Sequence, residues 1–356
     1  MTAPASAPPA AFELPTFWAP ITPLANADTQ AMAGEIGHWL QQTGVCPDAE
    51  QAALTGTVGA YGTAATIPGA TGLNARTLAR YMAWGFALDD EGDRAGTSED
   101  SLHQLIRRAA RLVQIMETPD ALTPDDDIWV QALADIAQDL HTIAQPSALR
   151  RAIDGFRSYA LGTVHEASLQ RTTTLPSLDD YLAFRYAHGA GDAVAAMVEI
   201  STGVDIPAHE IDSPAARAAT QTALTVALLD NELLSRHKET ERGEYDCSLI
   251  RVLQNEDPHL TLQEAVDTAN AVRNRTLDTF LKLRDTLHPG ASPQLRTYLE
   301  ALGHLIAGVT MWTATSPRYT SDTSPTGEPR LSDTDTARHH PLTLPKDIAR
   351  WNRLTD

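Results

Sequence analysis

The sequence contains only two cysteines, Cys46 and Cys247, and no CxxC pair. This excludes a disulfide framework and argues against a zinc site or thiol redox chemistry built on paired cysteines. No uninterrupted apolar run of about 20 residues occurs, so no membrane span is expected. The first residues also lack the basic and apolar regions of a secretory signal. We therefore expect a cytoplasmic protein that receives any apolar substrate in an internal cavity.

Basic residues are scarce in this chain. Its 356 residues include 27 Lys and Arg against 46 Asp and Glu, which gives a formal net charge of −19. Binding to the phosphate backbone of nucleic acid needs clustered Lys and Arg, so no nucleic-acid partner is expected. The acidic balance does not exclude a phosphorylated ligand that is held through metal ions.

Helical periodicity is what the sequence does have. From about residue 27 to 317, apolar residues recur at helical spacing, and little period-two alternation indicates strands. We expect an all-α, single-domain helical bundle over residues 11–319. The Ala/Pro-rich residues 1–10 and the Thr/Ser/Asp/Pro mixture at 320–356 predict flexible tails, the second disordered and removable with folding intact.

The first acidic cluster ends the stretch "WGFALDDEGD" at residues 84–93. On a helix Asp89 and Asp93 lie on one face, with Asp90 turned about 100° away. Carboxylates brought together repel unless a cation neutralises them, and open oxygen-rich sites of this kind suit Mg²⁺. The alternative is a solvated helix end.

The second polar stretch is "DNELLSRHKE" at residues 230–239. Asn231, Ser235 and Glu239 have i, i+4, i+8 spacing, which places an amide oxygen, a hydroxyl and a carboxylate along one helical face. All three can donate oxygen to one hard cation. An exposed polar stripe would give the same pattern, but the preceding apolar "TALTVALL" favours a buried helix that reaches an opening.

Together these stretches carry a resemblance to a known family. "DDEGD" at 89–93 resembles the DDxxD motif, and "NELLSRHKE" at 231–239 resembles the NDxxSxxKE motif, of bacterial class I terpene synthases. Arg185 lies 46 residues before Asn231, where this family places an arginine that senses diphosphate. "WTATSPRY" at 312–319 resembles the family's terminal Trp and Arg-Tyr pair. The resemblance covers roughly residues 14–320 and implies the class I terpenoid synthase helical fold.

The resemblance implies three Mg²⁺ ions, with oxygen ligands from both motifs. Two ions would be bound by Asp89 assisted by Asp93, and the third by Asn231, Ser235 and Glu239. Asp90 would organise the site through hydrogen bonds. The diphosphate would be held by three cationic side chains and one hydroxyl: Arg185, Lys238, Arg318 and Tyr319. This set makes electrostatic sense, because a leaving diphosphate needs cations to absorb its growing charge.

The Gly189 and Gly191 pair predicts a helix break four residues after Arg185. The family uses such a break to couple diphosphate sensing to ionisation, with the effector carbonyl at Gly189. Close packing of helices at glycine is the alternative. His188 stands where relatives often have an acidic residue, and Glu232 stands where they usually have Asp. We expect Glu232 to turn away from the Asn231 face, with little effect on metal binding.

The implied function is a carbon–oxygen lyase that ionises a linear isoprenyl diphosphate, cyclises the cation in an apolar cavity and releases diphosphate. Farnesyl diphosphate is the first choice of substrate; geranylgeranyl diphosphate is the alternative, followed by chain elongation by a transferase or a nonenzymatic helical interaction protein. The released diphosphate is the expected base, and the family often forms homodimers. Ring faces stabilise cations, and the candidate cavity aromatics are Trp84, Phe86, Phe184, Tyr186 and Trp312.

Other acidic runs predict ordinary helix starts. "PDDDIW" at 124–129 and "LDDYL" at 178–182 place acidic residues where they meet the positive end of a helix dipole. Ser177 is a candidate N-cap with Asp180 three positions on. ExxH pairs at 35–38 and 256–259 are poor di-iron candidates, because Pro258 interrupts the second.

Overall fold

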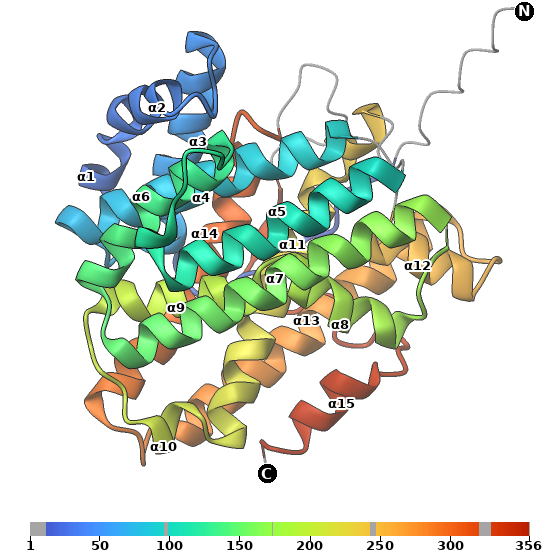
Figure 1. Ribbon diagram of the computed structural model, residues 1–356. Helices are drawn as coiled ribbons and strands as arrows, with labels where there is room; N and C mark the ends of the chain where they lie inside the picture. Colours follow the sequence, from blue (N-terminus) through green and yellow to red (C-terminus); the bar gives the residue numbers. More distant parts are fainter. Residues whose placement is uncertain (1–11, 96–98, 173, 243–246, 320–328, 356) are drawn as a thin grey trace, which may run out of the picture.

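The computed structural model describes residues 12–95, 99–172, 174–242, 247–319 and 329–355, and within them the side chains of 92–95, 99 and 237–242 lie outside the description. The predicted all-α class is confirmed over these ranges (Figure 1). The helices are α1 (Ala27–Gln30), α2 (Ala33–Gln42), α3 (Ala49–Thr66), α4 (Gly72–Ala95), α5 (Glu99–Glu117), the 3₁₀ turn η1 (Pro119–Ala121), α6 (Ile128–Ile143), α7 (Pro146–Thr172), α8 (Leu178–His188), α9 (Gly191–Thr202), α10 (Ala208–Ile211), α11 (Pro214–Arg242), α12 (Leu249–Glu256), α13 (Leu262–Leu287), α14 (Pro293–Thr315) and α15 (Lys346–Asn352). The strands are β1 (Phe17–Trp18) and β2 (Leu331–Ser332).

Side-chain caps set several helix starts. Asp127 accepts hydrogen bonds from the backbone N–H groups of Trp129 and Val130 at the start of α6. Ser177 accepts one from Asp180 N at the start of α8, and its hydroxyl donates to the Asp180 carboxylate at 2.6 Å. Both acidic runs that were predicted to be helix starts are therefore confirmed in that role.

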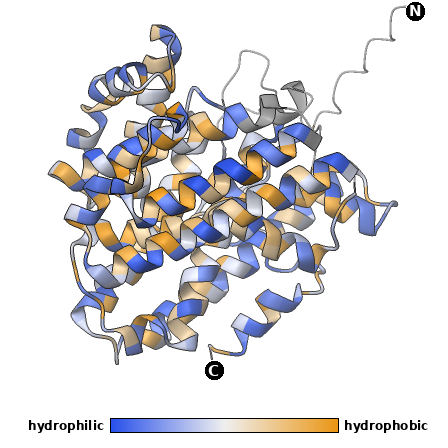
Figure 2. Cartoon of the chain, viewed as in Figure 1, coloured by the Kyte–Doolittle hydropathy of each residue, from blue (hydrophilic) through white to orange (hydrophobic). Residues whose placement is uncertain are grey.

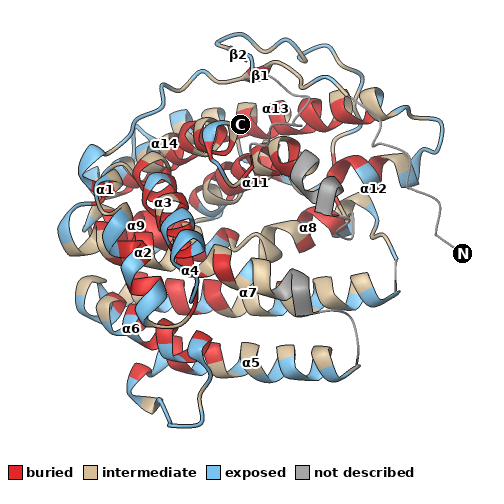
Figure 3. Ribbon diagram, turned by 90° about the horizontal axis from the view of Figure 1, so that it is seen from above, coloured by how far each residue is buried: buried red, intermediate tan, exposed pale blue. Residues whose placement is uncertain are grey.

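The core includes α11, α13 and α14, where Figure 3 shows many buried residues, and extends through α9 to α6, while α5 on the outside is mostly exposed or half-buried. Hydrophobic and hydrophilic bands alternate around the helices (Figure 2). A buried ion pair joins the three central helices: Arg273 Nε and Nη2 donate to the two carboxylate oxygens of Asp230 at 2.6 and 2.8 Å, and Thr310 donates to the same carboxylate at 2.6 Å. This network fixes the rotation of α11 one residue before Asn231.

The expectation of a disordered tail over 320–356 is wrong for residues 329–355. Strand β2 pairs in parallel with β1, and α15 packs against α8, α11 and α13 (Figure 1). Ile348 and Trp351 are buried, and the Trp351 indole N–H donates to Gln221 at 3.0 Å. The polar average composition led to the wrong prediction of disorder, because a few apolar side chains at helical spacing suffice to dock the segment. Residues 320–328 and 1–11 lie outside the described ranges.

None of the helices in the described ranges is long and apolar enough to cross a membrane.

Candidate active site

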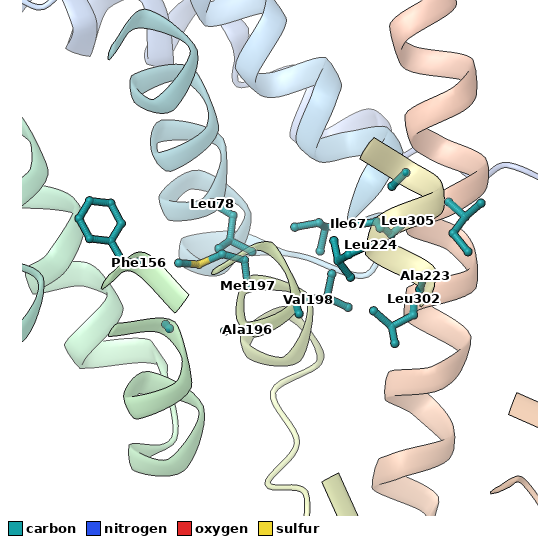
Figure 4. Close-up of a cluster of buried hydrophobic side chains, with 14 of the residues drawn as sticks. Ile67, Leu78, Phe156, Ala196, Met197, Val198, Ala223, Leu224, Leu302 and Leu305 are labelled. Atoms are coloured by element: carbon teal, nitrogen blue, oxygen red, sulfur yellow. The ribbon is translucent and has the colours of Figure 1, made fainter. Parts of the chain in front are cut away.

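A cavity of about 340 Å³ lies between α4, α7, α8, α9, α11 and α14. This volume falls at the lower end of the range typical of small-molecule sites. Much of its wall is apolar, and Figure 4 shows Leu78, Met197, Leu224 and Leu305 converging from four of these helices. Asp89, Arg185, Asn231, Arg318 and Tyr319 also line it, so the structure brings together residues from four separate predicted motifs.

The acidic end of α4 contributes one edge of the site. Asp89 lines the cavity with 44% of its side chain exposed, whereas Asp90 is only 12% exposed. The apolar run before them anchors α4 in the core, where Trp84 is 1% exposed. The backbone of Asp93 continues α4, but its side chain lies outside the described part.

The polar end of α11 forms the facing edge. Asn231 lines the cavity, and its amide nitrogen donates to the Tyr319 hydroxyl at 3.1 Å. Ser235, one turn further on, is buried and is not among the cavity-lining residues. The side chains of Lys238 and Glu239 lie outside the described part. Among the side chains that are described, no three His, Cys, Asp or Glu form a metal-ligating cluster.

Arg318 and Tyr319 bridge the two edges. Arg318 donates through Nη1 to Asp90 at 2.6 Å and through Nη2 to Asp89 at 3.1 Å, while its guanidinium lies 4.6 Å from the Phe86 ring centroid. Burial opposes the charged form, yet the nearby Tyr319, Asp90 and Asp89 raise the pKa of Arg318 above its usual value. Its buried Nε has no hydrogen-bond partner among the described atoms. The site therefore holds a permanent cation with one donor available to an anion.

Arg185 is held by a residue whose importance the sequence analysis missed. Glu232 is buried, accepts a hydrogen bond from Arg185 Nε at 3.3 Å, and also accepts from the Tyr181 hydroxyl and the Leu249 backbone N–H. Glu232 does leave the Asn231 face as expected, but it points at the arginine rather than at solvent. A carboxylate inside an apolar helix stretch was the available signal, because buried carboxylates need partners.

The predicted helix break is present, but neither Gly189 nor Gly191 adopts a left-handed backbone there. Helix α8 ends at His188 and α9 begins at Gly191, and the residue with left-handed backbone is Ala190, at φ 57° and ψ 31°. Gly189 has φ −75°, but a Cβ there would lie 2.3 Å from Leu228 Cδ2 and 2.8 Å from Arg185 Nη1. Close packing therefore requires this glycine, and Arg185 is one of the groups packed on it.

Gly189→Ala tests this packing. The added methyl must displace Leu228 or the Arg185 guanidinium, so we expect turnover to fall by about tenfold or more and stability to fall by about 1–3 kcal/mol. Gly290→Ala is the matched control, because nothing lies within 4 Å of the Cβ position there. Steady-state kinetics and urea unfolding of both variants measure the effect. Parent-like kinetics for Gly189→Ala would show that Arg185 does not depend on this contact.

Four of the five predicted aromatics line the cavity: Trp84, Phe86, Phe184 and Trp312. Tyr186 does not, and its prediction as a cavity residue is wrong. Its hydroxyl donates to Asp192 at 2.8 Å and its ring covers Gly191.

Two tyrosines and an acid–base pair in the cavity wall were missed by the sequence analysis. Tyr81 and Tyr159 line the cavity and are buried deeply enough that desolvation raises the pKa of each hydroxyl. Tyr81 precedes Asp89 by two helical turns, so its spacing could have indicated the shared face. Glu166 and His188 also line the cavity, although no motif marks Glu166.

Comparison with known proteins identifies the family. The model for terpene synthase family 2, C-terminal metal binding, matches residues 80–279. Bonnadiene synthase of Allokutzneria albata is 30% identical over 95% of this chain and 97% of that protein. This chain belongs to the bacterial class I terpene synthases. It is therefore a lyase of the terpene cyclase type, and the matched region is one that binds metal.

Further matches agree with this assignment. Spiroviolene synthase of Streptomyces violens is 34% identical over 68% of this terpene synthase and 67% of that protein. The crystal structure of the SVS_A2 protein from ancestral sequence reconstruction has a TM-score of 0.79 and 30% identity, and the match covers 96% of this chain and 98% of that one. The relatives include synthases of both sesquiterpenes and diterpenes.

Proposed function

We propose that this terpene synthase binds a linear isoprenyl diphosphate with three Mg²⁺ ions, ionises its carbon–oxygen bond and cyclises the resulting cation. Support comes above all from the convergence of Asp89, Asn231, Arg185 and the Arg318–Tyr319 pair on one end of an otherwise largely apolar cavity. The cationic and oxygen-donor groups face the charged end of such a substrate, and the apolar wall faces its hydrocarbon chain.

The donor chemistry fits a magnesium diphosphate. Carboxylate, amide and hydroxyl oxygens are the ligands that Mg²⁺ prefers, and Asn231 turns its nitrogen toward Tyr319, which leaves its oxygen for a cation. The residues that would hold the ions are Asp89, Asp93, Asn231, Ser235 and Glu239. When bound, the ions supply the positive charge that stabilises the departing diphosphate.

Side chains of the protein would supply the remaining contacts to the diphosphate and to the cation. Arg318 offers its unpartnered Nε, and Arg185 and Lys238 are the other proposed diphosphate cations, with Tyr319 as a hydroxyl donor. Phe86 and Trp312 line the cavity and stack with ring centroids 5.4 Å apart, and their ring faces can stabilise positive charge. The apolar wall excludes water, because an early encounter would quench the cation. Proton loss or water capture then ends the reaction.

Substrate length is the finer part of the proposal. Farnesyl diphosphate is the first choice, and a match named as a farnesyl diphosphate cyclising 4-epi-cubebol synthase supports it. Geranylgeranyl diphosphate is the alternative, which a match named as a diterpene cyclase supports. A cytoplasmic location and a homodimer stay predictions.

The test is incubation of purified protein with geranyl, farnesyl, geranylgeranyl and geranylfarnesyl diphosphates, with and without Mg²⁺, followed by gas chromatography with mass detection. We expect a cyclic hydrocarbon or alcohol from one substrate, formed only with Mg²⁺. Longer diphosphates on addition of isopentenyl diphosphate would select the chain-elongating alternative. Absence of turnover by folded protein would contradict the proposal.

A further inference from the structure

Helix α7 packs against the residues on both sides of the break between α8 and α9. A Cβ at Gly155 would lie 2.4 Å from Ala193 N in α9, and one at Gly162 would lie 2.5 Å from His188 N in α8. One helical turn after Gly162, the Glu166 carboxylate reaches His188, with Oε2 2.8 Å from Nε2. The break between α8 and α9, together with His188 at the end of α8, is therefore held against α7.

The His188 ring is held in one plane. It stacks on Phe184 with ring centroids 5.5 Å apart and planes 6° apart, and Phe184 and His165 pack in a T-shaped arrangement with ring centroids 5.1 Å apart. Burial disfavours the imidazolium, but Glu166 raises the pKa of His188 above its ordinary value. Burial likewise opposes ionisation of Glu166, yet His188 lowers the pKa of that carboxyl. Both shifts favour the ion pair over the neutral pair.

The surroundings of this pair connect it to Arg185. Within α8, Arg185 lies three residues before His188, and its positive charge acts against the imidazolium; Asp89 of α4 and Glu166 of α7 act for it. Arg185 Nη1 also packs on Gly189, the residue directly after His188. An imidazolium without Glu166 would repel Arg185 and would be free to shift the end of α8.

Stability alone does not account for the pair. The pair is partly buried, with 15% of the His188 side chain and 26% of the Glu166 side chain exposed. Exposed ion pairs contribute little to stability, and replacing a buried pair by apolar residues of similar volume is often neutral or stabilising, so this pair is weak evidence for a stabilising role. Glu166 and His188 instead share the cavity wall with Arg185, the proposed diphosphate cation.

We propose that Glu166 is a positioning residue for ionisation: acting through His188, its carboxylate supplies from α7 the negative charge that keeps Arg185 and the α8–α9 break in place. This inference rests on the proposed function. Glu166 itself is not assigned a contact with the reacting atoms.

Glu166→Gln is the central test, because glutamine keeps the shape and an oxygen acceptor for His188 but removes the charge. We expect kcat to fall by about 10- to 100-fold, the range found for outer partners of a site, with KM for the substrate changed much less. Product distribution should stay the same. Glu300→Gln, an exposed glutamate of α14, is the matched control.

Charge placement is tested by a second pair of variants. His188→Asp alone would set two carboxylates against each other, and kcat should fall at least as far as in Glu166→Gln. The double variant Glu166→Gln/His188→Asp restores one negative charge beside Arg185. Its kcat should therefore recover to within about threefold of the parent value. Thermal unfolding of all variants separates these effects from loss of folding.

The pH profile gives an independent readout. In Glu166→Gln, a proton taken up by His188 places an unbalanced positive charge beside Arg185, so kcat should fall as the pH decreases through the pKa of His188. In the parent, Glu166 balances this charge, and the decline should be absent or much smaller.

Three outcomes would overturn the inference: parent-like kcat and pH profile in Glu166→Gln, a double variant no faster than His188→Asp, or a changed product pattern at unchanged total turnover. The last would make Glu166 a proton acceptor in the cavity. A parent that turns over no isoprenyl diphosphate would instead contradict the proposed function itself.

Discussion

Asp89→Ala should reduce turnover by about 100-fold or more, because the proposed metal site would lose its cavity-facing carboxylate and with it much of the charge stabilisation of the leaving diphosphate. Of its two carboxylate contacts, Arg318 would keep the 2.6 Å bond to Asp90. Folding should be little affected, since the Asp89 side chain is 44% exposed. Single-turnover kinetics at saturating Mg²⁺ measure the ionisation step directly.

Asp125→Ala provides the control for this loss of charge. Asp125 is an exposed carboxylate in the acidic run before α6, outside the cavity. It should leave both turnover and magnesium dependence at parent values. If Asp89→Ala also formed product at the parent rate, Asp89 would have to be removed from the metal site.

Ending the chain after residue 328 should lower the free energy of unfolding by about 5 kcal/mol or more. The cut removes β2 and α15, and burial of a side chain such as Ile348 or Trp351 contributes about 2–5 kcal/mol by comparison with alanine. Because folded domains are stable by only about 5–15 kcal/mol, the midpoint of thermal unfolding should fall by roughly 10 °C or cooperativity should be lost. This reverses the expectation from sequence that the segment is dispensable.

Two point variants separate docking of α15 from general effects of truncation. Trp351→Ala removes a buried indole that donates to Gln221, and it should cost about 3 kcal/mol. Leu354→Ala, two residues after α15 and 38% exposed, should stay within about 0.5 kcal/mol of the parent. Urea unfolding gives both values. A truncated chain with parent stability would mean that the C-terminal segment does not contribute to the fold.

The features that were predictable from sequence are the periodic ones. Helical spacing of apolar residues located the helices, and i, i+4 spacing of polar oxygens marked Asp89 and Asn231 as candidate ligands. That the two residues belong to one site was implied by the family resemblance, and both line the cavity. Cap chemistry located the starts of α6 and α8, because Asp127 and Ser177 act on backbone groups only two or three residues away. Sequence spacing therefore predicts contacts between residues that lie close together in the chain.

The features that were missed depend on contacts between distant helices. Glu166 reaches His188 only because α7 crosses α8 at Gly162, and no spacing within α7 reports that crossing. Tyr186 lies on the side of α8 that meets the start of α9, where its ring covers Gly191 and its hydroxyl donates to Asp192. The C-terminal segment was misjudged by average composition, although docking depends on the few apolar residues in α15.

If the protein acts as proposed, the Arg318 guanidinium shared by Asp89 and Asp90 should couple the binding of the cation to that of the anion. A Mg²⁺ ion at Asp89 would compete with Arg318 for the carboxylate, and the displaced arginine would then be available to a diphosphate. Conversely, a diphosphate that engages Arg318 would release Asp89 for the metal. Since such coupling between two ligands is reciprocal, each should tighten the binding of the other by the same factor, and the enzyme should hold the magnesium diphosphate more firmly than the separate affinities of its two components indicate.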